Sequence, residues 1–107
     1  MRMMMKVSIP VKYGNKALSE GSLPQTVMGF VEKYMPESSY FVTEGGERTA
    51  IFFFEAKDTA DIPSIAEPFF MNLNASVTIT PAMNLDDMRS GIEKANKRIH
   101  EQEFQLS

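Results

Sequence analysis

The stretch Ser39–Glu55, SYFVTEGGERTAIFFFE, decides the fold of this chain. Two runs of aromatic and β-branched residues flank the pair Gly45-Gly46. Such runs favour strands, and glycine tolerates the positive φ that a two-residue turn requires. The stretch therefore predicts an antiparallel β-hairpin with strands over residues 39–44 and 48–55.

Both faces of the predicted hairpin are apolar. A turn that places Glu44 opposite Glu47 sets the register of the strands and puts Tyr40 opposite Ile51. One face then carries Tyr40, Val42, Ile51 and Phe53, and the other carries Phe41, Ala50, Phe52 and Phe54. Because helices on one side of a sheet cover only one face, we expect something else to cover the second face.

Two further strands are predicted outside the hairpin. Residues Met3–Val11 alternate between apolar and polar side chains, and Pro10 is expected to end the pairing of this strand. Residues Asn74–Thr80 alternate in the same way, and Pro81 closes that strand. A period of two predicts a strand with one strongly buried face.

Three helices are predicted between and after these strands. The first begins at a capping box formed by Ser22 and Gln25 and ends at about Met35. Before it, Tyr13-Gly14-Asn15 predicts a turn, with a short helical segment through Gly21.

The second helix is predicted over Asp58–Met71, with Thr59 or Asp61 as its cap. Pro68 lies inside it and removes one backbone hydrogen bond, so we expect a kink or an early end there. The third helix begins at an Asn84 cap, with Asp87 at the capping-box position.

The predicted order is β-α-β-β-α-β followed by an extra C-terminal helix. Right-handed crossovers then place both main helices on one face of an antiparallel sheet, which is the ferredoxin-like α+β fold. With 107 residues the chain suits one hydrophobic core. We predict one domain over residues 1–99 and a loose tail over residues 100–107.

Composition argues against several classes of function. The chain has no cysteine, which excludes disulfides, thiolate metal sites and cysteine nucleophiles and suits a reducing cytoplasm. The net charge is −3 and the basic residues are scattered, which argues against a nucleic-acid partner. Because no apolar segment has the length of a signal sequence or a membrane span, we expect a cytoplasmic protein with no membrane partner.

Residues for catalysis or metal binding are sparse. His100 is the only histidine and falls near the end of the last predicted helix. A Ser-His-Asp device, a histidine metal cluster or a histidine-ligated haem would each depend on it, so we predict no metal and no cofactor. The carboxylate pairs Asp58/Asp61 and Asp86/Asp87 fall at helix starts, where capping explains them. Catalytic residues stay unassigned.

Four polar side chains are the candidates for ligand binding: Tyr40, Glu67, Asn72 and Asn74. The last three surround the Pro68 break, where freed backbone groups need partners. Local capping is the favoured interpretation of Glu67, Asn72 and Asn74. In the alternative, the break opens one end of a cavity between sheet and helices, and these groups face a bound molecule.

Several stretches together carry a family resemblance: Val7–Val11 with Gly14-Asn15, Arg48-Thr49 with Phe52–Phe54, Ile62–Phe70, Asn74-Ala75 and Pro81–Met83. Up to about Ala95 they resemble a family of small uncharacterised bacterial proteins. The resemblance implies the dimeric α+β barrel superfamily, in which two ferredoxin-like sheets pack face to face, and hence a homodimer. That superfamily includes monooxygenases, muconolactone isomerases, haem-degrading enzymes and ligand-sensing domains, among which the fold does not choose.

Three functional hypotheses remain open. In the leading one, the homodimer binds a small, largely apolar molecule between sheet and helices, without a cofactor. In the second, a cofactor-independent oxygenase or isomerase uses the same cavity, with Tyr40, Glu67 or Asn74 handling a proton or orienting the substrate. In the third, the dimer is an interaction module without a ligand.

Overall fold

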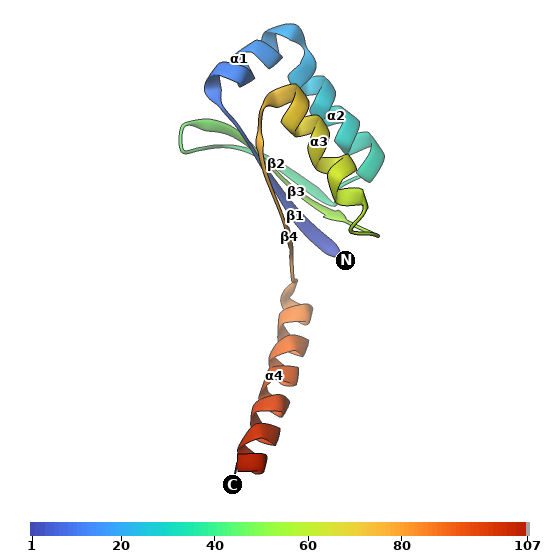
Figure 1. The fold of residues 1–107 in the computed structure, drawn as a ribbon, viewed down its shortest axis with the longest axis vertical. Coiled ribbons are helices and arrows are strands. Elements are labelled where there is room, and N and C mark those ends of the chain that lie inside the picture. Colours follow the sequence, from blue (N-terminus) through green and yellow to red (C-terminus); the bar gives the residue numbers. More distant parts are fainter. Residues whose placement is uncertain (107) are drawn as a thin grey trace.

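A computed structural model describes the backbone of residues 1–106 and the side chains of residues 1–102. The elements in chain order are β1 (Arg2–Ile9), α1 (Val11–Glu20), α2 (Ser22–Tyr34), β2 (Ser38–Glu44), β3 (Glu47–Glu55), α3 (Asp61–Leu73), β4 (Ser76–Pro81) and α4 (Leu85–Leu106). The strands form one antiparallel sheet in the order β2-β3-β1-β4. Helices α1, α2 and α3 lie on one side of this sheet (Figure 1). This arrangement confirms the predicted ferredoxin-like α+β fold.

The central hairpin has the predicted register. Glu44 pairs with Glu47 and Tyr40 pairs with Ile51. Both turn glycines adopt positive φ, 60° at Gly45 and 77° at Gly46, as the two-residue turn requires. The turn chemistry and the alternation of side chains agree here, which is why a local pattern predicts this element correctly.

The segment before α2 is more helical than predicted. Helix α1 includes the three residues that were expected to form a turn, and Gly14 is buried inside it. Gly21, with φ 84°, separates α1 from α2. The capping box expected at Ser22 is absent, since Ser22 already belongs to α2 and its hydroxyl donates to the Ala17 carbonyl (3.4 Å). The N–H of Gln25 donates instead to the Gly21 carbonyl (3.3 Å).

Helix α3 also corrects two predictions. Neither Thr59 nor Asp61 caps it, because Ala60 holds the N-cap position and donates its N–H to the Asp58 carboxylate (3.1 Å). The helix continues through Pro68 to Leu73, so the early end is wrong, and the alternative of a kink at Pro68 stays a prediction. Its buried stripe continues past the proline to Phe69 and Leu73, 1% and 0% exposed, and this burial offsets the backbone cost of about 3 kcal/mol.

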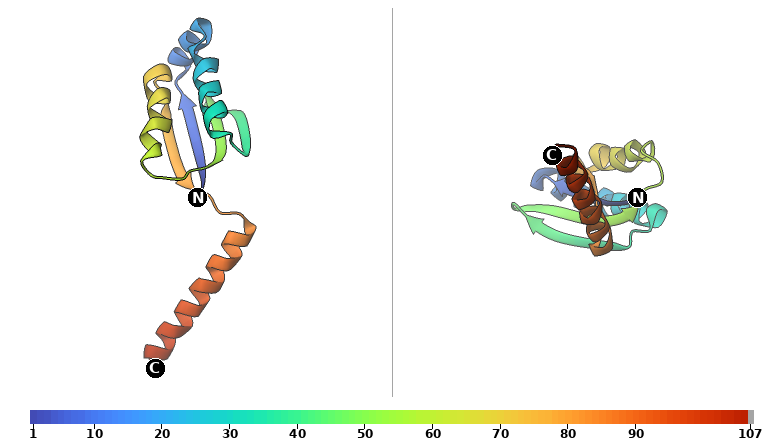
Figure 2. Two further views of the ribbon diagram at one scale, coloured as in Figure 1. Left: turned by 90° about the vertical axis from the view of Figure 1, so that its right-hand side faces the viewer. Right: turned by 90° about the horizontal axis from the view of Figure 1, so that it is seen from below.

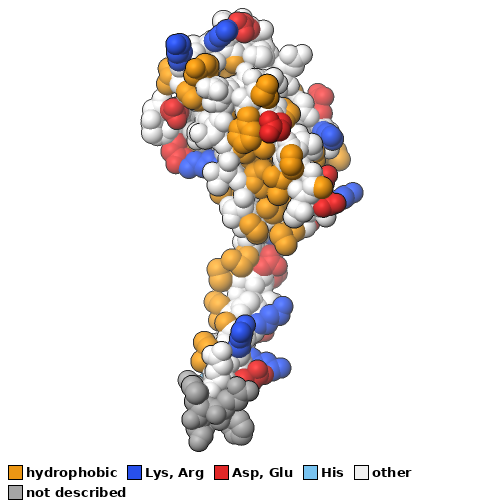
Figure 3. Space-filling view, viewed as in Figure 1, with side chains coloured by type: hydrophobic (Ala, Val, Ile, Leu, Met, Phe, Trp, Pro, Cys, Tyr) orange, Lys and Arg blue, Asp and Glu red, His pale blue; other side chains and the backbone are white. Residues whose placement is uncertain are grey.

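Helix α4 projects away from the sheet (Figure 2). Its start is the predicted capping box: the Asp87 N–H donates to Asn84 Oδ1 (2.8 Å), and the Asn84 N–H donates to Asp87 Oδ2 (3.1 Å). The helix runs to Leu106, so residues 100–106, expected as a loose tail, are helical. Apolar side chains gather along one edge of α4 and charged ones along the other (Figure 3). Among the described side chains of α4, the exposed large apolar residues are Leu85, Met88, Ile92 and Ile99.

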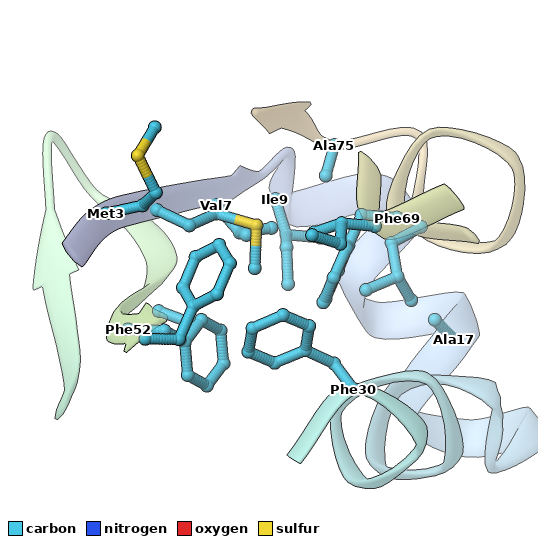
Figure 4. Packing of buried hydrophobic residues seen from close by; sticks show 13 residues of the cluster. Met3, Val7, Ile9, Ala17, Phe30, Phe52, Phe69 and Ala75 are labelled. Carbon is cyan, nitrogen blue, oxygen red and sulfur yellow. The ribbon is translucent and has the colours of Figure 1, made fainter. Parts of the chain in front are cut away.

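The hydrophobic core lies between the three helices and the sheet (Figure 4). Phe30 of α2 is at its centre, with ring centroids 4.8 Å from Phe52, 5.2 Å from Phe54 and 6.0 Å from Phe69. Strand β1 contributes Met3, Met5, Val7 and Ile9 to the same core. The face of the hairpin that bears Phe52 therefore packs on the helices, and no helix within residues 1–106 covers the face that bears Ile51 and Phe53.

Candidate functional site

A cleft of about 390 Å³ lies between α2 and the β2–β3 hairpin. Its lining residues come from α2, from the end of β1 and from both hairpin strands: Ile9, Leu23, Val27, Phe41, Val42, Thr43, Arg48, Thr49 and Ala50. Leu23 and Val27 are one helical turn apart on α2, so both face the sheet. The cleft occupies the space between sheet and helices, where the leading hypothesis places a ligand.

The cleft exists because the sheet extends beyond the helices that cover it. The hairpin turn reaches past α1 and α2 (Figure 1). Phe41, on the edge strand β2, lies on the helix side of the sheet and contacts the Phe52 ring at a centroid distance of 5.9 Å. Phe52 is fully buried, whereas Phe41 is 64% exposed. The apolar floor of the core therefore continues outward into solvent-accessible space.

The polar end of the cleft is formed by Arg48 and Thr43, which face each other across the hairpin. Arg48 Nη2 donates to Asn15 Oδ1 of α1 (3.0 Å). Gly14 permits this close approach, because a Cβ at its position would lie 2.7 Å from Arg48 Nη1 and 3.2 Å from Ile9 Cγ2. Helix α1 thus holds the guanidinium at the end of the cleft.

A second hollow is a groove of about 440 Å³ between α2 and α3. Phe30, Ile65 and Phe69 contribute to its floor. Two hydrogen bonds join the helices across it: Asn72 Nδ2 donates to Thr26 Oγ1 (3.2 Å), and the Tyr34 hydroxyl lies 3.3 Å from Ser64 Oγ. These four polar side chains therefore join the two helices across the groove.

The four candidate residues from the sequence do not converge. Tyr40 lies on the uncovered face of the sheet and is 57% exposed. Glu67 is exposed on α3 and lines none of the hollows described here. Asn72 and Asn74 share a smaller hollow of about 240 Å³ against α1. Asn74 ends α3 in a left-handed conformation (φ 51°) and donates its N–H to the Phe70 carbonyl (3.0 Å), which favours the capping interpretation.

Sequence reasoning missed Arg48 as a site residue. The two dipeptides Gly14-Asn15 and Arg48-Thr49 both belong to the stretches that carry the family resemblance. The joint presence of these two dipeptides is the only signal in the sequence. Their contact joins residues 33 positions apart, and no local pattern predicts it.

Among the described residues, no group of three or more His, Cys, Asp or Glu side chains is arranged to hold a metal ion. None of the described helices combines the length and the apolar character needed to cross a bilayer. His100 lies exposed on α4.

No family model and no curated protein matches this chain. One solved structure with a similar fold is a Deinococcus radiodurans protein assigned as an antibiotic biosynthesis monooxygenase. It is 8% identical to this chain with a TM-score of 0.43, and the match covers 78% of this chain and 94% of that one. This similarity concerns the fold only, and the fold assignment rests on the strand order and register.

Proposed function

We propose that this protein binds a small, largely apolar molecule in the cleft between α2 and the hairpin. The observation that carries the proposal is the exposed apolar lining, with Phe41 at the rim and Leu23 and Val27 on the opposite wall. Small-molecule sites are typically hollows of about 300–1,000 Å³ with mostly apolar walls and a few polar groups. A ligand that covers this lining would gain about 25 cal/mol of binding free energy for each Å² of apolar surface removed from water.

The lining also favours binding over the oxygenase or isomerase alternative. That alternative assigned proton handling to Tyr40, Glu67 or Asn74, and none of these residues lines the cleft. The polar side chains that line it from the helix side of the hairpin are Thr43 and Arg48, whereas the Thr49 hydroxyl donates to the Glu47 carbonyl (3.2 Å). Hydroxyls and a guanidinium are groups that orient a ligand, since neither is a base near neutral pH.

A fluorescent apolar probe tests this proposal. N-phenyl-1-naphthylamine is uncharged, and we expect its emission to increase when it binds the wild-type chain. Val27→Trp fills the cleft and should weaken binding at least tenfold, which is about 1.4 kcal/mol. Met28→Trp is the matched control, because Met28 is the next residue of α2, is 48% exposed and lies outside the cleft lining.

Equal affinity of the Val27→Trp and Met28→Trp variants would contradict the proposal. So would a wild-type chain that does not bind the probe. Circular dichroism of both variants shows whether the fold is retained. Mass spectrometry of compounds incubated with the protein gives a separate readout, because conversion of a bound compound would establish the enzymatic alternative instead.

We further propose that the protein is a homodimer in which a second copy covers the uncovered face of the sheet. The register brings Tyr40 beside Ile51 and Met4 beside Phe53 on that face. Tyr40 is 57% exposed, and the other three are half-buried. A contiguous apolar patch of this kind is typical of an interface, and a two-fold axis makes one patch serve both copies.

Sedimentation velocity tests the homodimer. At about 10 μM we expect wild-type dimers, since obligate interfaces of this type are large and apolar. Ile51→Asp should give monomers, because two buried carboxylates would face the interface. Met71→Asp, at an 80% exposed position of α3 on the other side of the sheet, should stay dimeric. A monomeric wild-type chain would overturn the proposal, and a dimer without any probe binding would favour the interaction module.

A further inference from the structure

Arg48 places an unneutralised positive charge at the polar end of the apolar cleft. Its side chain is half-buried, and its hydrogen-bond partner, Asn15, is a neutral amide. Within the described side chains, ion pairs join carboxylates to Arg2, Lys6 and the terminal amine, and none includes Arg48. Glu44 lies on the opposite face of the hairpin from Arg48 and pairs with Lys6.

The position of this guanidinium is fixed from two directions. Arg48 pairs with Ile9 in the sheet, and β1 continues directly into α1, which supplies Asn15. Gly14 leaves the space that the guanidinium occupies. A hydrogen bond to Asn15 uses one of the five N–H donors of an arginine, so the others are available to a ligand. Such a prearranged fork loses little entropy when it binds.

We infer that the ligand of the cleft is an apolar carboxylate, a small aliphatic or aromatic acid whose tail lies between Val27 and Phe41 and whose carboxylate pairs with Arg48. This inference rests on the proposed function. A half-buried charge is unfavourable unless it is paired, and the guanidinium fork matches the two oxygens of a carboxylate. Thr43, opposite Arg48, adds a hydroxyl donor at the same end.

Two probes with the same tail separate the charge from the apolar contact. Octanoate and 1-octanol are titrated against the bound N-phenyl-1-naphthylamine, and each affinity is obtained from its displacement. We expect the wild-type chain to prefer octanoate at least tenfold. Raising the salt concentration should reduce this preference, because salt screens a partly exposed ion pair.

Three variants assign the preference to Arg48. Arg48→Met keeps an apolar stem of similar length and should abolish the preference for octanoate while leaving the affinity for octanol unchanged. Asn15→Leu keeps the guanidinium but removes its anchor, and it should reduce the preference several-fold. Arg89→Met removes the same charge from an exposed position of α4 and should leave both affinities unchanged.

The outcomes distinguish this inference from the proposed function. Equal affinities of the wild-type chain for octanoate and octanol would contradict the inference that the ligand is a carboxylate. They would not contradict the proposal that the cleft binds an apolar molecule. A preference that persists in Arg48→Met would also overturn it. If N-phenyl-1-naphthylamine, octanoate and 1-octanol all fail to bind, the proposal that the cleft is a ligand site is contradicted. If Arg48→Met does not fold, the wild-type preference, its salt dependence and the Asn15→Leu variant decide.

Discussion

The two faces of the sheet carry similar side chains in different surroundings. Phe52 and Phe53 are neighbours in β3 and point to opposite faces. Phe52 is fully buried among the rings of the core, whereas Phe53 is only half-buried. Because both right-handed crossovers return over the same side, the topology covers one face and leaves the other without a helix among the described residues.

The covered face is itself uneven. Near β1 it is sealed by α2 and α3, and Met5 and Val7 are fully buried. At the edge strand β2 the cover ends, and Phe41 is left 64% exposed. The difference between these two parts of one face produces the cleft, so the position of the cleft depends on how far α2 covers the sheet.

The largest loss of stability is expected from truncating Phe52, and the same change at Phe53 on the opposite face is its counterpart. Phe52→Ala should destabilise the protein by about 3–5 kcal/mol, because it leaves a cavity in a closed core. Phe53→Ala should cost clearly less in the monomer and should mainly weaken dimerisation. Urea denaturation of each single variant in the Ile51→Asp background measures the two losses without dimerisation. Equal losses there would mean that the two faces are equally buried in the monomer.

A smaller loss is expected from Gly45→Val, which tests the turn that sets the register of both faces. With φ 60° and no atom within 4 Å of a built Cβ, the cost comes from the backbone alone and should be about 1–3 kcal/mol. Gly29→Ala, in the interior of α2, is the control and should stabilise by about 0.5 kcal/mol. An unchanged melting temperature of Gly45→Val would show that the turn tolerates a β-branched residue, against this account.

Asn74→Ala should cost about 1 kcal/mol, because alanine disfavours the left-handed conformation at the end of α3. Asn74 lies outside the cleft, so the affinity for N-phenyl-1-naphthylamine should not change. Thermal denaturation and the probe titration measure the two effects on the same sample. A tenfold loss of affinity with unchanged stability would return Asn74 to the ligand site.

The smallest effect is expected at His100, which belongs to neither face of the sheet. His100→Ala should change the free energy of unfolding by less than about 0.5 kcal/mol, as is usual at exposed positions. Probe binding should be unchanged as well. A large loss of probe binding in the same titration would show that His100 contributes to the ligand site.

Features set by neighbouring residues could be predicted from the sequence. Gly45-Gly46 and the alternation around it determine the hairpin register, and Asn84 with Asp87 determines the start of α4, because each depends on contacts a few residues apart. The expected cap at Ser22 failed for the complementary reason. Gly21 holds the N-cap position, so α2 starts one residue earlier, and α1 covers the expected turn with Gly14 buried inside it.

Local sequence patterns were enough to predict the ferredoxin-like order of elements, the two apolar faces of the hairpin and the capping box of α4. They did not predict which face the helices cover, that α3 continues through Pro68, or that Arg48 meets Gly14 and Asn15 at the end of a cleft. These outcomes depend on packing between segments distant in the chain. Burial energies there exceed local preferences, and no short-range pattern records them.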